Sequence, residues 1–371
     1  MSSASAASST EAAAGPPVGG PPGFGVYVHI PFCARRCDYC AFATWTDRSH
    51  LMERYASACR QEVVAARLAP ATSVFFGGGT PSMLPGHLLT SILDSIDRAP
   101  GAEVTVECNP ETVDAGLFDA YVAAGVNRVS FGVQSMDPEI LASLGREHDP
   151  ATVVRAAALA AAAGFQSWSV DLIYGAVGES LASWRSTLEA VLALDPPHVS
   201  AYALTVEPGT PLARDSTRFP DDDDQADKYL LADELLGRAG FEWYEISSWS
   251  QPGHQCRHNQ LYWRQGDYRG IGCAAHSHDR GRRWWNVRTP ERYIAAVESA
   301  GPAMAGEERL TADESRQEAL QLALRTSSGV DTAALADGDG LDGLVEDAGK
   351  GRLRLTPRGR LLGNAVSRQL R

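Results

Sequence analysis

The stretch from Val26 to Cys40, VYVHIPFCARRCDYC, joins a short strand pattern to three closely spaced cysteines. β-Branched and aromatic residues up to Ile30 predict a strand. The cysteines that follow have the spacing C-x3-C-x2-C, and we expect them on the loop that leaves this strand. The sequence therefore predicts a metal centre, held by Cys33, Cys37 and Cys40, at the carboxyl end of a strand.

Three thiolates can hold three corners of a cubane [4Fe-4S] cluster and leave one iron without a protein ligand. The natural bidentate ligand of an open iron in this arrangement is the amino and carboxylate pair of S-adenosylmethionine. Zinc is the alternative, but structural zinc normally takes four protein ligands, so His29 before the loop would have to serve. The spacing favours a [4Fe-4S] cluster with S-adenosylmethionine over zinc.

Short strand patterns alternate with helical stretches through the first two hundred residues, which is typical of parallel βα units. The predicted strands are Val26–Ile30, Val74–Phe76, Glu103–Glu107, Arg128–Val133, Ser169–Ile173 and Val199–Leu204. The predicted helices lie near Leu51–Leu68, Leu88–Arg98, Val113–Ala124, Thr152–Ala163 and Leu181–Leu194. Six units are too few for the eight-stranded closed barrel, so we expect an α/β fold with an open, partial (β/α)6 barrel. Its site would lie at the carboxyl ends of the strands.

The rest of the chain divides by composition. Residues 1–23, rich in Ala, Ser, Gly and Pro, predict a disordered tail, and residues 24–208 the barrel. Residues 209–305 form an extension, in which Asp221–Asp224 opens a helix and an aromatic, strand-like region follows from Phe241 to about Trp285. Residues 306–371 predict a small, α-rich, winged-helix-like domain.

Charge and hydropathy exclude several classes of protein. With 46 acidic and 33 basic residues the net charge is −13, which argues against a general nucleic-acid binder. No apolar run reaches the ~18–20 residues of a membrane span, so an integral membrane protein is not expected. The tail has no basic residue or apolar stretch of a signal peptide, and three of the seven cysteines are clustered. We therefore expect a cytoplasmic protein with reduced thiols.

Further polar or glycine-rich segments follow the other strands. Gly77–Pro81 would let backbone groups approach the methionine end of the nucleotide cofactor, or would form a plain tight turn. Glu107 could hold ribose hydroxyls, whereas Asn109 beside it could simply cap a helix. Tyr39 offers an aromatic edge for the adenine.

Gln134, Arg146 and Asp171 lie at or just beyond the fourth and fifth strands. Each one alone reads as a satisfied structural group, because a charged residue inside an apolar strand is costly unless partnered. Together they place polar groups at successive strand ends around the opening of the barrel, which predicts a cofactor site.

Histidine and tryptophan concentrate between residues 243 and 285, which hold four of the nine histidines and five of the eight tryptophans. They are His254, His258, His276, His278, Trp243, Trp249, Trp263, Trp284 and Trp285. Flat aromatic surfaces with an imidazole suit haem, whose iron takes a histidine ligand, and His258 to Trp263 is the local run. Two alternatives stay open: an aromatic core with locally bonded histidines, or zinc held by Cys256, His258, Cys273 and His276.

The cysteine loop, Gly77–Pro81, Gly132–Gln134, Asp171–Gly175, His258–Trp263 and Leu355–Gly359 together resemble the oxygen-independent coproporphyrinogen III oxidase family of radical SAM proteins. The likeness covers nearly all of the chain after residue 24. The oxidases carry a further cysteine two positions after the third, where this chain has Phe42. That departure points to the haem-chaperone (HemW-like) branch, which also carries an H-N-x-x-Y-W run for haem.

The resemblance implies roles for particular residues. Cys33, Cys37 and Cys40 would ligate the cluster, and S-adenosylmethionine would be bordered by Tyr27, Gly78, Gly79, Thr80 and Glu107. Gln134, Arg146 and Asp171 match positions that contact a second S-adenosylmethionine in the oxidases. Haem would bind near His258 and pass to a haem-requiring acceptor, such as a respiratory membrane protein. Oxidative decarboxylation of coproporphyrinogen III is the alternative activity.

Overall fold

The computed structural model describes residues 23–335 and 340–371, so all but the last residue of the predicted tail lies outside the described part. Six parallel strands follow one another across a sheet in chain order. They are β1 (Gly25–Ile30), β2 (Ala71–Gly78), β3 (Arg98–Cys108), β4 (Arg128–Gln134), β5 (Ser167–Tyr174) and β6 (His198–Ala203). Every predicted strand is present, and the six βα units of a partial barrel are confirmed.

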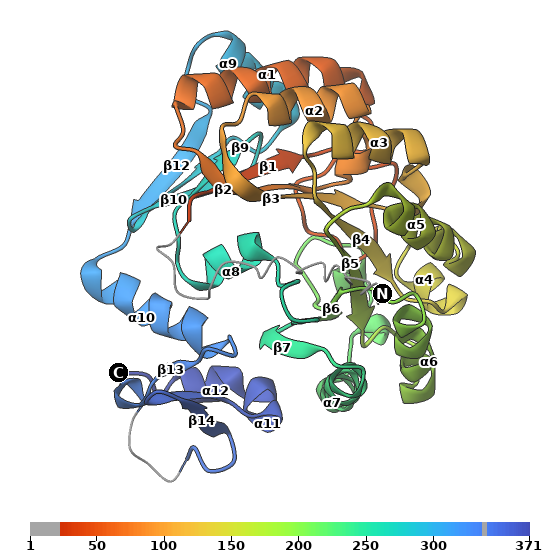
Figure 1. Cartoon of the computed structure of the whole chain (residues 1–371), viewed down its shortest axis with the longest axis vertical. Coiled ribbons are helices and arrows are strands. Elements are labelled where there is room, and N and C mark those ends of the chain that lie inside the picture. The colour runs from red at the N-terminus through yellow and green to blue at the C-terminus, as the bar shows by residue number, and fades with distance from the viewer. Residues whose placement is uncertain (1–22, 336–339) are drawn as a thin grey trace, which may run out of the picture.

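Helices cover the outer face of these strands (Figure 1). They are α1 (Met52–Ala66), α2 (Gly86–Asp94), α3 (Ala115–Ala124), α4 (Pro138–Ser143), α5 (Pro150–Ala163) and α6 (Leu181–Leu192). Between helices and strands lies the main core, to which alternate strand residues such as Val26 and Val28 contribute. Side chains of Asp114, Asp149 and Ser180 cap three of these helices by accepting backbone N–H bonds.

Two helix predictions need correction. The helix expected over Leu88–Arg98 ends at Asp94, and Arg98 is instead the first residue of β3. Pro100, the third residue of β3, disfavours helical geometry at Ala99, so the helix could not have continued through this segment. The short helix α4 was not predicted, although Asp137 at its N-cap and Pro138 at its first position are typical of a helix start.

The extension continues the sheet at both edges rather than forming a separate layer. Beyond β6 lie β8 (Ser248–Ser250) and β7 (Glu242–Glu245). Beyond β1 lie β9 (Tyr268–Ile271), β10 (His276–Asp279), β11 (Arg282–Asn286) and β12 (Met304–Arg309). Three helices complete it: α7 (Asp222–Arg238), α8 (Arg257–Trp263) and α9 (Pro290–Glu298).

Helix α7 begins at the acidic run as predicted, but α8 interrupts the region expected to be strand-like. Its start is fixed by a residue distant in sequence. The buried Glu103 carboxylate on β3 accepts the backbone N–H groups of Arg257 and His258, both at 3.0 Å. A carboxylate at a helix N-terminus satisfies donors that the helix itself leaves free.

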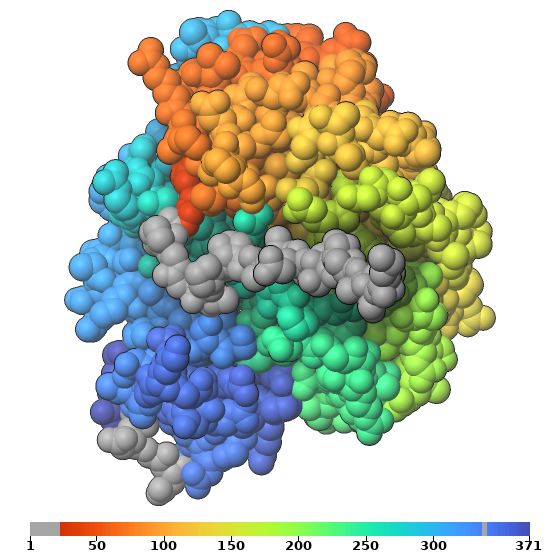
Figure 2. Space-filling model, viewed as in Figure 1, coloured from red at the N-terminus to blue at the C-terminus, as the bar shows by residue number. Residues whose placement is uncertain are grey.

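The C-terminal residues have a small core of their own, which includes Leu324, Leu355 and Val366. Helix α10 (Ala312–Leu324) precedes a sheet of β13 (Val330–Asp331), β15 (Arg352–Leu355) and β14 (Val345–Gly349), followed by α11 (Pro357–Leu361) and α12 (Gly363–Ser367). Since β12 pairs with β11, the second core begins after Arg309 rather than at residue 306. In Figure 2 this unit, in blue, lies beside the extension. Across the described ranges, no helix has the length and apolar character needed to cross a membrane.

Candidate functional site

The three clustered cysteines lie on the loop between β1 and α1, and all three thiols are free and half-buried. Backbone hydrogen bonds close the loop at its base. Trp45 donates to the Pro31 carbonyl at 2.8 Å, and Cys33 donates to the Trp45 carbonyl at 3.1 Å. The loop is thus held in one place at the carboxyl end of β1, as the sequence predicted.

His29 ties the same loop to the interior of the sheet. Its Nε2 lies 2.9 Å from the Ala43 carbonyl, and its Nδ1 lies 3.0 Å from the Tyr27 hydroxyl. A carbonyl only accepts, so Nε2 carries the proton and Nδ1 accepts from Tyr27. Burial lowers the pKa of His29 to about 4, which keeps the ring neutral. Both nitrogens are therefore occupied, and the zinc-ligand role considered for His29 is not supported.

The glycine run after β2 packs against the cysteine loop. Gly79 and Thr80 donate backbone N–H groups to the carbonyls of Ile30 and Phe32, both at 2.8 Å. A Cβ on Gly79 would lie 2.7 Å from the Phe32 carbonyl oxygen, and Gly78 has a φ of +109° that favours glycine. The sequence predicted that the backbone of this glycine run would approach a cofactor closely. In this structure it closely approaches the end of β1 and the start of the cysteine loop.

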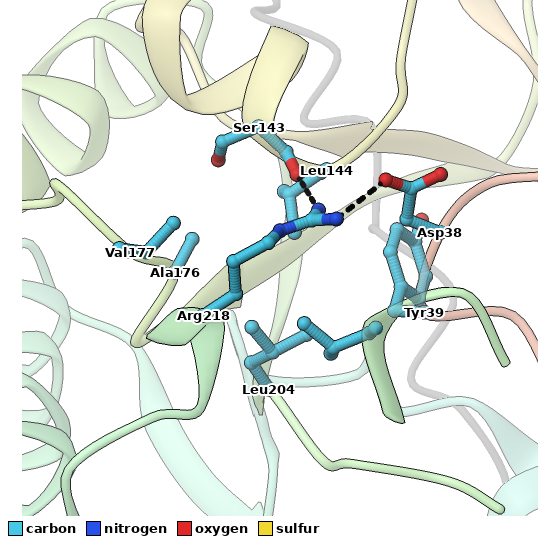
Figure 3. A pocket seen from close by; sticks show the side chains of 9 residues that line it. Asp38, Tyr39, Ser143, Leu144, Ala176, Val177, Leu204 and Arg218 are labelled. Carbon is cyan, nitrogen blue, oxygen red and sulfur yellow. Dashed lines mark hydrogen bonds and ion pairs between the residues drawn. The ribbon is translucent and has the colours of Figure 1, made fainter. Parts of the chain in front are cut away.

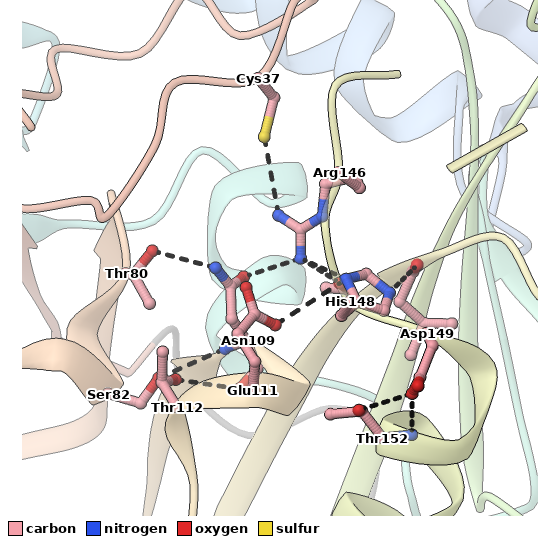
Figure 4. Close-up of polar contacts among 12 residues, drawn as sticks. Cys37, Thr80, Ser82, Asn109, Glu111, Thr112, Arg146, His148, Asp149 and Thr152 are labelled. Atoms are coloured by element: carbon pink, nitrogen blue, oxygen red, sulfur yellow. Dashed lines mark hydrogen bonds and ion pairs between the residues drawn. The ribbon is translucent and has the colours of Figure 1, made fainter. Parts of the chain in front are cut away.

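Arg146 connects the cysteine loop to the ends of β3 and β4 (Figure 4). Its guanidinium donates to the Cys37 sulfur at 3.6 Å, to the Gly132 carbonyl at 2.9 Å and to Asn109 Oδ1 at 3.1 Å. The guanidinium is a charged hydrogen-bond donor to this sulfur. Arg146 therefore lies against the cysteine loop, and its contact with a second S-adenosylmethionine stays a prediction.

Asn109 and Thr80 extend this network to a second cysteine. Asn109 Nδ2 donates to Thr80 Oγ1 at 3.3 Å, and Thr80 Oγ1 donates to the Cys33 sulfur at 3.6 Å. The Asn109 side chain makes no helix-cap hydrogen bond, so the capping alternative is wrong. Sequence reasoning had given Asn109 no role at the site, and nothing in its local pattern distinguishes it from a cap.

Burial affects the thiols themselves. It raises the pKa of Cys33 to about 11 and also raises the pKa of Cys40. Cluster loading must therefore release protons from at least these two thiols. Three half-buried sulfurs with hydrogen-bond donors from Arg146 and Thr80 fit the chemistry of an iron–sulfur ligand set.

Zinc is not supported by the geometry. Within residues 23–335 and 340–371, no three His, Cys, Asp or Glu side chains converge closely enough to hold a single metal ion. The proposed zinc set is dispersed: the Cys256 thiol contacts Glu103 at 3.6 Å and the Cys273 thiol accepts from Tyr55 at 3.5 Å. The zinc alternative at Cys256, His258, Cys273 and His276 is therefore wrong.

Tyr39 lies where the loop meets an apolar cluster around Leu144, Leu204 and Leu212 (Figure 3). Beside it, Arg218 pairs with Asp38 at 2.9 Å and fixes this part of the loop. The space between these side chains is only about 10 Å³, which holds no more than about one water. The adenine contact expected of Tyr39 stays a prediction.

A cavity of about 320 Å³ opens inside the barrel and gathers several predicted residues. Its wall includes Tyr27, Gly78, Glu107, Asp171 and His258. Glu107 accepts from the Gly78 N–H at 3.1 Å, and burial, with repulsion from Asp171, raises its pKa to about 8.

The same cavity shows one residue that sequence reasoning missed. Arg128, on β4, is buried in the wall of the cavity, together with the carboxyl groups of Glu107 and Asp171. Gln134, at the end of β4, has a φ of +67°, and its amide lies close over Gly132. Left-handed backbone at a non-glycine residue is often found at functional sites, which marks this strand end.

His258 is fully buried beside this cavity, and both of its ring nitrogens have partners. Nδ1 lies 2.9 Å from Ser73 Oγ, and Nε2 lies 2.8 Å from the Tyr262 hydroxyl. Burial lowers the pKa of His258 to about 3, so the ring is neutral. Its haem contact stays a prediction, and the geometry favours His258 as the residue that positions Tyr262.

Other members of the aromatic segment are structural. His278 bonds the Gly266 carbonyl at 3.0 Å and the Gly281 N–H at 3.1 Å, and His254 bonds Ser167 at 3.1 Å. Trp249 and Trp284 are buried. Much of the segment thus matches the core alternative. His276 does not, because its imidazole is exposed beside Trp285.

Comparisons with known proteins identify the family of the chain. The family model of the radical SAM superfamily matches residues 27–191. The chain is 43% identical to the haem chaperone HemW of Mycobacterium tuberculosis, over 95% of this chain and 96% of the relative. It is 40% identical to the haem chaperone HemW of Escherichia coli, over 69% of this chain and 70% of the relative.

Among solved structures, coproporphyrinogen III oxidase (HemN) from Escherichia coli, a radical SAM enzyme, superposes with a TM-score of 0.81. The alignment covers 93% of this chain and 89% of that one, at 23% identity. At this identity the likeness concerns the fold alone.

Proposed function

Because this chain belongs to the HemW family of radical SAM proteins, we propose that it is a haem chaperone, which binds haem and transfers it to an acceptor protein. The observation that carries the proposal is the 43% identity to a haem chaperone over 95% of the chain. The family also implies a [4Fe-4S] cluster and S-adenosylmethionine as cofactors.

Cys33, Cys37 and Cys40 would hold the cluster, with Thr80 and Arg146 donating to two of their sulfurs. When bound, such a cluster supplies an open iron for S-adenosylmethionine and a low-potential electron. Around the cofactor we place the following residues: Tyr27, Tyr39, Gly78, Gly79, Thr80, Glu107, Gln134, Arg146 and Asp171. His29 and Tyr27 hold the loop end at Ala43 in position.

Haem is the cargo, and His258 with Tyr262 would shape its site. The acceptor would be a haem-requiring protein, such as a respiratory membrane enzyme. We place the transfer in the cytoplasm, where all seven cysteines, which are free thiols in the structure, stay reduced.

The alternative is the oxidative decarboxylation of coproporphyrinogen III, which the oxidase-like fold permits. Phe42 argues against it, since the oxidases carry a cysteine there. In this structure the Phe42 side chain is 65% exposed and lines the cavity of about 320 Å³ inside the barrel, where it presents an apolar surface rather than a thiol.

The test is anaerobic cluster reconstitution followed by haem titration and a decarboxylation assay on the same sample. We expect one haem per chain, and no carbon dioxide from coproporphyrinogen III even with S-adenosylmethionine and a reductant. Release of carbon dioxide from the propionates at catalytic rates would favour the oxidase, and failure to bind haem would refute the chaperone.

A further inference from the structure

A second cavity, of about 630 Å³, opens on the other side of the cysteine loop, between that loop and strands β1, β9, β10 and β11. Pockets for small molecules and cofactors are typically ~300–1,000 Å³ and largely apolar. This cavity is within that range. Tyr27, Phe42 and Tyr262 belong to both cavities, so the two spaces adjoin at the loop.

The walls of this cavity suit a flat aromatic ligand. Phe42, Tyr262, Tyr268 and Trp285 contribute ring surfaces. Phe42 is 65% exposed, which is unusual for so large an apolar side chain and leaves its face free for a ligand. Rings on opposite sides of a cavity can sandwich a planar molecule through offset stacking.

The charges of the wall point to an anionic ligand. Arg288 and Arg292 line the cavity, and none of the lining residues is Asp or Glu. Within the described ranges, neither guanidinium makes an ion pair. Both side chains are exposed at the cavity and free to bind carboxylate or phosphate groups of a ligand.

The cavity also offers an imidazole. His276, on β10, stacks on Trp285 with ring centroids 5.7 Å apart and an interplanar angle of 28°. Within the described ranges no hydrogen-bond partner occupies its ring nitrogens, in contrast to those of His258. The ring is exposed at the cavity but partly desolvated there, which lowers the pKa of His276, so the neutral ring presents a lone pair at neutral pH.

We propose that this cavity is the haem site, with His276 as the iron ligand and with Arg288 and Arg292 binding the two propionates. The inference rests on the proposed function and specifies where its cargo binds. It assigns His258 to positioning Tyr262, because using His258 as a ligand would break a hydrogen bond from Ser73 or Tyr262 in the buried interior.

Titrating the reconstituted full-length protein with haemin, and separately with iron-free protoporphyrin IX, tests the assignment. His276→Ala should raise the Kd for haemin by about tenfold or more and shift the Soret band. It should leave protoporphyrin IX binding unchanged, because that ligand has no iron. His258→Ala should keep the Soret position of the wild type, and His87→Ala, an exposed histidine on α2, is the matched control.

Arg288→Ala combined with Arg292→Ala should weaken both porphyrins by about tenfold or more, since the propionates are common to both. Arg60→Ala, at an exposed arginine on α1, removes one positive charge outside the cavity and should change neither affinity. Cluster absorbance and the thermal midpoint establish that each variant is folded.

Two results would overturn the assignment: an unchanged Soret band in folded His276→Ala, or, in folded His258→Ala loaded with haemin, the Soret shift expected from loss of the iron ligand. Failure of the wild type to bind haemin would instead contradict the proposed function, so the two hypotheses fail in different experiments.

Discussion

Glu107 shows how the barrel changes the chemistry of a single side chain. Burial and the nearby Asp171 raise its pKa to about 8 from an ordinary 4.5. The folded protein therefore holds this proton more tightly than the unfolded chain does. Between those two values the unfolded chain releases the proton first, so the stability of the fold decreases as the pH rises. Above about 8 the loss is complete.

Glu107→Gln should remove this dependence, because the amide is neutral and can still accept from the Gly78 N–H. We expect a higher free energy of unfolding than the wild type near pH 8 and a difference that shrinks toward pH 5. Urea denaturation across this range measures it. A constant difference between variant and wild type at every pH would show that Glu107 is ionised throughout.

The sulfur of Cys37 accepts a hydrogen bond from the Arg146 guanidinium. In Cys37→Ser we expect loss of the broad brown absorbance of a cubane cluster after reconstitution, because two thiolates should not retain it. Cys59→Ala, which removes a buried thiol from α1, is the control and should keep full iron and sulfide. Bound zinc without sulfide in the wild type would refute the cluster.

At the scale of elements, α8 depends on β3 for its position. Its seven residues are too few to be stable alone, since isolated helices shorter than ~12–15 residues are marginal. The Glu103 carboxylate accepts the N–H groups of Arg257 and His258 and thereby fixes the helix that carries Tyr262. One buried side chain thus places an aromatic residue that faces both cavities.

Glu103→Ala should lower the free energy of unfolding by roughly 2–4 kcal/mol, because it leaves buried backbone donors without partners. We also expect weaker haem binding at temperatures where the variant is still folded. Glu53→Ala, at an exposed position of α1, should change stability by less than about 0.5 kcal/mol. Equal stabilities of the two variants in guanidinium unfolding would show that α8 does not need the carboxylate.

At the scale of the whole molecule, Arg360 links the C-terminal unit to the extension. It pairs with both carboxylate oxygens of Asp233 at 2.7 and 2.8 Å. Its guanidinium also lies 4.3 Å from the centre of the Trp243 ring. Since the side chain is only 6% exposed, the ion pair is not screened as a surface pair would be.

Arg360→Ala should free the C-terminal unit, because it leaves the Asp233 charge partly buried without its partner. We expect faster amide hydrogen exchange in α11, α12 and β13–β15, with the barrel strands unchanged. Calorimetry should resolve a separate transition at lower temperature. Arg358→Ala, at an exposed arginine two residues earlier on α11, is the matched control, and identical exchange in the two variants would contradict the link.

Local sequence patterns were enough to predict the barrel and the cysteine loop, because both depend on residues close together in the chain. Alternation of strand and helix patterns places six parallel strands in order, and the short spacing of Cys33, Cys37 and Cys40 needs no folding to bring them together. The family resemblance read from these motifs is confirmed by relatives over nearly the whole chain.

The contacts of each polar residue, in contrast, depend on the folded chain. Arg146 is 109 residues from the sulfur it reaches, and Glu103 is 155 residues from the N–H group of His258, so no local pattern reveals either pair. The same holds for the histidines. His258 and His276 both belong to the aromatic segment, but packing gives the first two hydrogen-bond partners and leaves the second open to a cavity. Local spacing fixes which elements form, whereas burial and long-range contacts decide which side chains are free to bind a ligand.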